Sequence, residues 1–200
     1  MGSMTTLRKI SRSFLFLTGL LASTPACASD IKASVSEAPV LPVMRPEFPV
    51  PNEPNMLFYV QRSVNANTVV YTAHLDGQGL PAAENPIDVY WRWYNVDGHR
   101  KPLNFIEREM AYGVTVDDAT HASGSRGFEV AALPKRKLIL GQDSKGKPEA
   151  LIQMGSRLAK LVYVYLNVDD SGLMPSVKSI DLFGVDTLTG KILHEHDLRA

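Results

Sequence analysis

The 200-residue sequence has little cysteine, no charge imbalance and no long apolar run. Cys27 is its single cysteine, which excludes an internal disulfide and a multi-cysteine metal site. Its 21 basic residues equal its 21 acidic residues, so we expect no nucleic-acid partner. The apolar stretch at residues 14–22 is too short to span a bilayer, which takes about 20 residues.

Catalytic signatures are also missing. The sequence has no G-x-S-x-G nucleophile elbow, no H-E-x-x-H zinc motif and no glycine spacing that would cradle a phosphate. Glu107 and Glu109 stand two apart, and on a helix such residues point in different directions. We therefore predict no catalytic residues and no cofactor. The sequence disfavours an enzyme without excluding one.

The first residues have the three-part pattern of an export signal. Arg8, Lys9 and Arg12 precede the apolar stretch, and Ala26-Cys27-Ala28 fits the small-residue cleavage rule. The sequence predicts a signal peptide over residues 1–28 and a periplasmic or secreted protein. Removal of its three basic residues would leave 18 basic against 21 acidic residues, a mildly acidic chain without cysteine.

Two variants of export stay open. Cys27 would tether the protein to a membrane if it became the lipidated first residue of a lipoprotein, but Pro25 before it is unfavourable. A twin-arginine signal is disfavoured because the segment around Arg12 lacks the second arginine.

Composition divides the mature chain in two. Residues 29–55 hold six prolines, which fix φ and donate no ladder hydrogen bond, so we expect an extended tether. Residues 56–200 are rich in short β-type runs and form one expected domain. Those runs are 56–62, 68–75, 87–95, 128–133, 137–140, 149–154, 161–168, 177–185 and 191–196.

Turn chemistry indicates how the runs connect. Asp97-Gly98 suits a type I′ hairpin, and Gly146 and Gly190 stand where a type I turn with a G1 bulge needs glycine. One short helix is expected over 104–111, with a strand as the alternative, and 117–127 is expected to be a loop. The predicted fold is all-β, a mainly antiparallel sandwich or barrel with one short helix.

Three segments carry a family resemblance. They are 54–67 (PNMLFYVQRSVNAN), 85–91 (NPIDVYW) and 109–114 (EMAYGV). The chain resembles, over about residues 54–197, an uncharacterised family of predicted exported bacterial proteins known as a domain of unknown function. The resemblance implies that the segment is one evolutionary unit, and it implies no activity.

A row of polar and aromatic side chains is the first candidate site. Strand alternation places Asp88, Tyr90, Arg92 and Tyr94 on one face and the two tryptophans, Trp91 and Trp93, on the other. Such a row could bind a small polar ligand or an envelope component, and the competing interpretation is an exposed, self-packed sheet face. A further alternative exposes the tryptophans as a stacking platform. The leading hypothesis is an exported, non-enzymatic binding or envelope-associated module.

Histidines give a second, weaker candidate. His194 and His196 are two apart, so in a strand they share one face and could supply part of a metal site. A third ligand, His74, Asp76 or His121, would have to complete the set through the fold. A small periplasmic hydrolase or metal-dependent enzyme using these three histidines is the alternative function.

Overall fold

The computed structural model describes residues 44–120, 124–172 and 175–198. The predicted signal peptide (1–28), Cys27 within it, and residues 29–43 of the predicted tether lie outside the described residues. The predictions of export, cleavage and lipidation therefore stay predictions.

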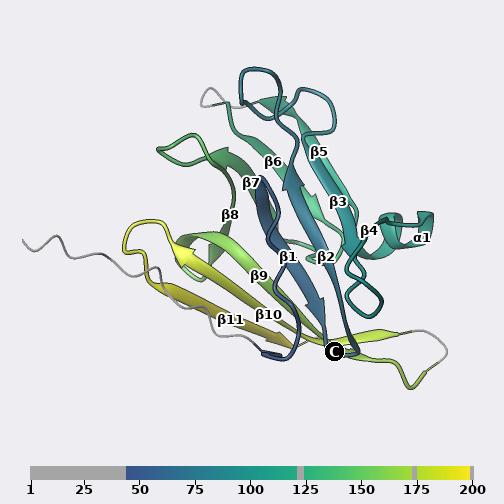
Figure 1. Ribbon diagram of the computed structural model, residues 1–200. Helices are drawn as coiled ribbons and strands as arrows, with labels where there is room; N and C mark the ends of the chain where they lie inside the picture. Colours follow the sequence, from purple (N-terminus) through teal and green to yellow (C-terminus); the bar gives the residue numbers. More distant parts are fainter. Residues whose placement is uncertain (1–43, 121–123, 173–174, 199–200) are drawn as a thin grey trace, which may run out of the picture. The chain divides into compact units, whose positions relative to one another are not determined.

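The described chain is mostly β-strand with one short helical element, which confirms the predicted fold class (Figure 1). The strands are β1 (Met56–Arg62), β2 (Asn65–Ala73), β3 (Ile87–Arg92), β4 (Arg100–Pro102), β5 (Val114–Thr120), β6 (Arg126–Val130), β7 (Lys137–Gln142), β8 (Pro148–Met154), β9 (Arg157–Asp169), β10 (Ser176–Asp186) and β11 (Ile192–Leu198). The helical element is α1 (Phe105–Glu107), continued by the π-helical turn η1 (Arg108–Tyr112).

Strand β9 joins two wings of one sheet. Its start pairs antiparallel with β8, its later part pairs parallel with β1, and β10 runs antiparallel along nearly its whole length. Because a strand has two edges and β10 takes one, β8 and β1 share the other. The first wing is β4-β3-β2-β1 and the second is β5-β6-β7-β8, while β11 extends the sheet beyond β10. The β1–β9 pair is parallel, whereas the other strand pairs of the described sheet are antiparallel.

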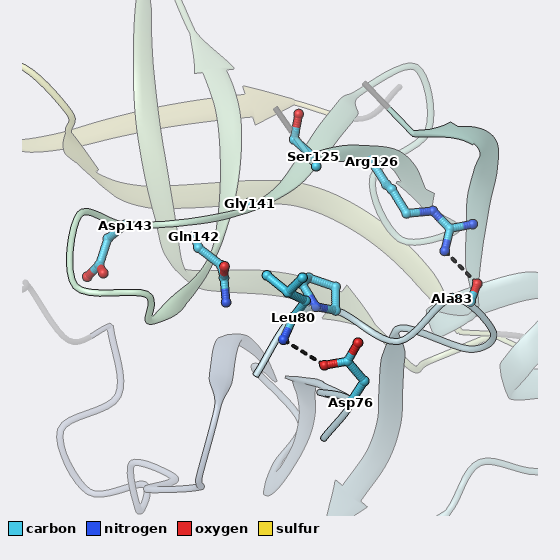
Figure 2. Close-up of a pocket in the computed structure, with 10 residues that line it drawn as sticks. Asp76, Leu80, Ala83, Ser125, Arg126, Gly141, Gln142 and Asp143 are labelled. Atoms are coloured by element: carbon cyan, nitrogen blue, oxygen red, sulfur yellow. Dashed lines mark hydrogen bonds between the residues drawn. The ribbon is translucent and has the colours of Figure 1, made fainter. Parts of the chain in front are cut away.

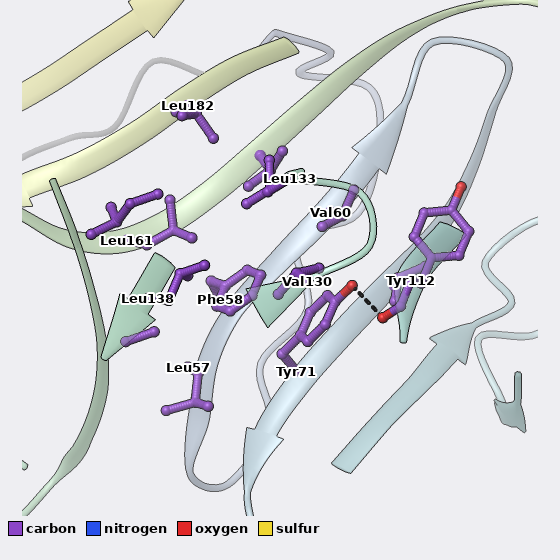
Figure 3. Close-up of a cluster of buried hydrophobic side chains, with 14 of the residues drawn as sticks. Leu57, Phe58, Val60, Tyr71, Tyr112, Val130, Leu133, Leu138, Leu161 and Leu182 are labelled. Carbon is purple, nitrogen blue, oxygen red and sulfur yellow. Dashed lines mark hydrogen bonds between the residues drawn. The ribbon is translucent and has the colours of Figure 1, made fainter. Parts of the chain in front are cut away.

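Apolar side chains of the two wings meet in one buried cluster (Figure 3). Phe58 and Tyr71 come from the first wing, and Phe128, Leu138 and Ile152 from the second. Alternation along the strands produces this cluster, since every second residue points toward the facing wing. Burial of these side chains is the main stabilising contribution to the domain.

The local predictions are confirmed in part. Asn104 caps α1 through the expected capping box with Glu107, so the helix prediction is right and its strand alternative is wrong. Gly146 and Gly190 have positive φ as expected. In the Asp97-Gly98 turn only the glycine does, and the amide of Gly98 donates to Trp93, so this is a longer loop rather than a type I′ turn.

The prediction of a loop over 117–127 is wrong for most of that segment. Strand β5 continues to Thr120 and β6 begins at Arg126, so the connection is much shorter than expected. Backbone pairing with β6 holds the end of β5 in the sheet, although the sequence there has no apolar alternation that would predict a strand. Residues 121–123 lie outside the described residues.

The side of β1, β9 and β10 that points away from the large buried cluster carries a row of stacked rings, which continues onto β11. Tyr59 stacks on Tyr163 at 4.8 Å, Tyr163 on Phe183 at 5.2 Å, and Phe183 on His194 at 4.4 Å between ring centroids. Each ring lies opposite the next in the strand register, which is why the row is continuous across four strands.

Residues 44–55, which belong to the predicted tether, contact β1 and β2. The carbonyl of Pro49 accepts from Gln61 Nε2 at 3.1 Å, and the carbonyl of Asn55 accepts from the amide of Ala73 at 2.9 Å. These bonds place this part of the chain against β1 and β2.

Candidate functional site

Three residues of the predicted aromatic and polar row lie on β3, and neighbouring residues of the chain already pair with its arginine. Arg92 donates to both carboxylate oxygens of Glu53, at 2.5 and 2.7 Å, and to the carbonyl of Gly98 at 3.1 Å. These charged hydrogen bonds hold the pKa of Glu53 below its ordinary value. Sequence reasoning missed Glu53 because it lies 39 residues before Arg92.

The rest of the row is packed in the same way. Tyr90 is only 3% exposed, and the guanidinium of Arg100 lies 3.8 Å from the centre of its ring. Arg100 also pairs with Asp88 at 3.7 Å. Burial raises the pKa of Tyr94 above its ordinary value. Asp88, Tyr90 and Arg92 lie on β3, whereas Tyr94 lies in the turn after it, so the predicted row of four on one strand is only partly formed. Its charged groups, Asp88 and Arg92, are paired with Arg100 and Glu53.

Trp91 and Trp93 behave as expected of core residues. Trp91 is 3% exposed and belongs to the buried cluster, and Trp93 packs against that cluster. The exposed stacking platform weighed as an alternative is therefore wrong for Trp91.

The structure brings two of the three predicted histidines together. His194 Nε2 and His196 Nδ1 each lie within hydrogen-bond distance of Asp181 Oδ1, at 2.7 and 2.8 Å. Asp181 is 4% exposed, so the two imidazoles satisfy a buried carboxylate. Its position in the apolar run Ile180–Phe183 was the signal that could have revealed it, because a buried carboxylate needs partners.

His74 lies apart from this pair. It follows β2, and three strands (β1, β9 and β10) lie between β2 and β11 in the sheet order. Within the described ranges, no group of three or more His, Cys, Asp or Glu side chains is arranged to hold a metal ion. The metal interpretation gains no support from this geometry.

A hollow between the β2–β3 and β7–β8 connections has a volume of about 510 Å³ (Figure 2). The polar side chains around it make hydrogen bonds to backbone groups of the surrounding loops. Arg126 donates to the carbonyl of Ala83 at 2.7 Å, and Asp76 Oδ1 accepts from the amide of Leu80 at 3.0 Å. Gln142 donates to the carbonyl of Gly79 at 2.7 Å. We interpret this hollow as a product of loop packing.

An apolar groove beneath the helical element is the strongest candidate site. Its volume is about 510 Å³, within the range of small-molecule pockets. Its walls come from five separate parts of the chain: the end of β1, the end of β3, α1 with η1, the β6–β7 connection, and strands β9 and β10 with Pro175 just before β10. The lining residues are Arg62, Trp91, Ile106, Glu107, Met110, Ala111, Tyr112, Ala131, Ala132, Pro134, Leu166, Val168, Pro175, Val177 and Ile180.

The helical wall presents apolar side chains to solvent. Ile106 is 65% exposed and Met110 is 70% exposed. They are four residues apart, so a helical turn places them on one face. The element ends at Gly113, where an added Cβ would clash with the carbonyl oxygen of Arg108. Only glycine therefore fits at the exit from the element that carries the exposed apolar face.

The floor of the groove is aromatic. Trp91 and Tyr112 meet edge to face, with ring centroids 5.1 Å apart. The carbonyl of Tyr112 accepts a 2.8 Å hydrogen bond from the hydroxyl of Tyr71 in the core (Figure 3). Burial raises the pKa of Tyr71 well above its ordinary value, so it remains a donor at physiological pH. This bond fixes the end of η1 to the first wing.

Arg62 brings a positive charge to the groove. Its guanidinium lies 4.7 Å from the ring centre of Trp91, and its terminal nitrogen donates to Asn65 at 3.2 Å. Burial raises the pKa of Tyr112, and the neighbouring Arg62 acts in the opposite direction. The sequence contained Arg62 at the end of an expected strand, but nothing in the local pattern marked it as a site residue.

Fold and site define a class: a curled, mainly antiparallel β domain with an open apolar groove containing one arginine. Residues 58–196 match the family model described as a domain of unknown function (DUF4833). The chain therefore belongs to this family, as the sequence resemblance suggested. No curated protein and no solved structure matches the chain. In the part of the chain that is described, no helix has the length and apolar character needed to cross a membrane.

Proposed function

We propose that this domain is a binding module that receives the apolar part of a small organic molecule in the groove beneath α1 and η1. One observation carries the proposal: the groove is lined mainly by apolar side chains, yet it is open, with Ile106 and Met110 exposed at its rim. Exposed apolar side chains around a concave surface are typical of ligand sites. A ligand that covers them gains the hydrophobic free energy that the free protein leaves unused.

The apolar contribution has a measurable signature. Each methylene group buried contributes about 0.8 kcal/mol, which corresponds to about a fourfold gain in affinity. The expected result is that unbranched neutral alcohols from hexanol to dodecanol displace a neutral fluorophore, N-phenyl-1-naphthylamine, with affinity rising by up to this factor per methylene. The rise should stop once the groove is filled. Affinity independent of chain length would contradict the proposal.

Neighbouring residues of α1 offer a matched pair of variants. Ile106 lines the groove, whereas Phe105 is more exposed, at 77%, and does not line it. We expect Ile106→Ser to weaken alcohol binding several-fold and Phe105→Ser to leave it unchanged. Equal effects of the two substitutions would show that the fluorophore binds to exposed apolar surface in general.

We also propose that the domain acts outside the cytoplasm, in the periplasm or after secretion. The support is the sequence of residues 1–28, with its basic start, apolar stretch and small-residue cleavage pattern. Intact mass of the protein purified from an exporting bacterial host tests this. A mature chain beginning at Ser29 is expected, a lipidated chain beginning at Cys27 would support membrane tethering, and an uncleaved chain would contradict export.

A further inference from the structure

The groove contains a cation without a counter-ion. Among the described residues, Arg92 pairs with Glu53 and Arg157 with Asp186, whereas no carboxylate lies within ion-pair distance of Arg62. Removing a guanidinium from water without a counter-charge costs free energy, so such a group favours an anion that can approach it.

The neighbours of Arg62 orient it without neutralising it. Trp91 stacks on the guanidinium, and Asn65 accepts from one terminal nitrogen. Tyr112 contributes a neutral hydroxyl next to the guanidinium. The Nε atom of Arg62 is buried and has no hydrogen-bond partner in the described part of the chain. A guanidinium has five N–H donors, so several remain available for an acceptor that this chain does not supply.

Glu107 is the other charged residue of the groove, and its carboxylate takes part in the cap of the helix. Its Oε2 accepts from the amide of Asn104 at 2.8 Å in the capping box, at the start of the helix. A carboxylate in that position is stabilised by the unsatisfied amides of the first helical turn. Glu107 keeps its negative charge but is held at the start of the helix, whereas the unused hydrogen-bond donors of the groove belong to Arg62. The remaining lining is mostly apolar.

We propose, building on the proposed function, that the ligand is a single-chain amphiphile with an anionic head group. The head, a carboxylate or a phosphate monoester, pairs with the Arg62 guanidinium. The hydrocarbon chain lies along the apolar walls formed by α1, η1 and strands β9 and β10, with Met110 and Val177 among its contacts. The arginine fork suits both kinds of oxyanion, because it can donate two parallel hydrogen bonds.

A head-group series tests the inference on the full chain. Four ligands share a twelve-carbon chain: dodecanoate, dodecyl phosphate, dodecanol and dodecyltrimethylammonium. At pH 8 and below their micelle-forming concentrations, calorimetry is expected to show at least one anion binding about tenfold tighter than dodecanol, and the cation binding weakest. Comparison of dodecanoate with dodecyl phosphate distinguishes the two kinds of head group.

Variants assign the preference to one residue. Arg62→Met keeps the approximate length of the side chain and removes its charge, and it is expected to abolish the difference in affinity between the anions and dodecanol. Arg108→Met, in the exposed part of η1 and outside the groove lining, is the control with the same charge change. Arg62→Lys, which keeps the charge, should retain part of the preference and serves if Arg62→Met does not fold.

The outcomes separate this inference from the proposed function. Equal binding of dodecanoate, dodecyl phosphate and dodecanol would overturn the anionic head group and leave the apolar groove intact. Preference for the cation would overturn it in favour of Glu107. Failure of every amphiphile to bind would overturn both, and an anion preference that survives Arg62→Met would remove Arg62 from the site.

Discussion

Substitution of Tyr71 by phenylalanine should destabilise the domain by removing one buried hydrogen bond. Tyr71 is fully buried, and its hydroxyl donates to the carbonyl of Tyr112 at 2.8 Å. Tyr71→Phe leaves this carbonyl without its donor, and an unsatisfied buried polar group costs about 1–3 kcal/mol. We expect a loss of about 2 kcal/mol, which for a domain of this size lowers Tm by roughly 4–8 °C.

Urea denaturation followed by tryptophan fluorescence measures this loss. The midpoint should fall while the slope m stays constant, because the surface exposed on unfolding is unchanged. Tyr59→Phe is the matched control, since Tyr59 is also buried, at 4% exposure, and no hydrogen bond of its hydroxyl is found among the described residues. The reasoning is refuted if Tyr71→Phe and Tyr59→Phe unfold at the same urea concentration.

Three further substitutions test other parts of the structure. Gly113→Ala should cost about 3 kcal/mol in urea unfolding because its Cβ would meet the Arg108 carbonyl, whereas Gly77→Ala, with open space around it, should cost far less. The pKa of Glu53 is lowered from 4.5 by its arginine partner, so the pair stabilises the fold above about pH 4.5 and this contribution disappears as the pH falls further. Glu53→Gln should therefore cost about 1 kcal/mol at pH 7 and progressively less as the pH falls below 4.5, and a cost that does not shrink with falling pH would refute the pair. Asp186→Ala should cost about 1–2 kcal/mol in thermal unfolding, because its carboxylate accepts two turn amides at 2.8 Å, and Asp186→Asn should retain most of the stability.

Local signals in the sequence predicted most of the strands. The predicted β-type runs match β1, β8 and β10 to within one residue at each end, and the capping box located the helix, whereas the run predicted over 87–95 ends three residues earlier, at Arg92. Two strands were missed: β4 has only three residues, Arg-Lys-Pro, and β5 ends in an acidic stretch. Both are held in the sheet by hydrogen bonds to a neighbouring strand. Such pairing leaves no mark in the local pattern of apolar residues, so the sequence alone could not predict it.

The site was harder to predict than the fold. Alternation placed the predicted row of β3 on one face, but it could not show that Glu53 already pairs with Arg92. The groove joins five segments distant in sequence, and its arginine stands at the end of an ordinary strand. Such a surface exists only after the chain has folded, so motif and spacing arguments could not find it.

The shared edge of β9 has a consequence for the order of folding. Gln61 of β1 and Tyr163 of β9 are 102 residues apart in the sequence, yet their side chains are hydrogen-bonded and their strands are paired. A growing chain therefore carries β1 with one edge unpaired until more than half of the domain has followed it. Closing so long a loop is entropically costly, and non-local pairing slows folding. We expect refolding on the slow, millisecond-to-second scale of high-contact-order β proteins, with the first wing docking only after β9 has formed.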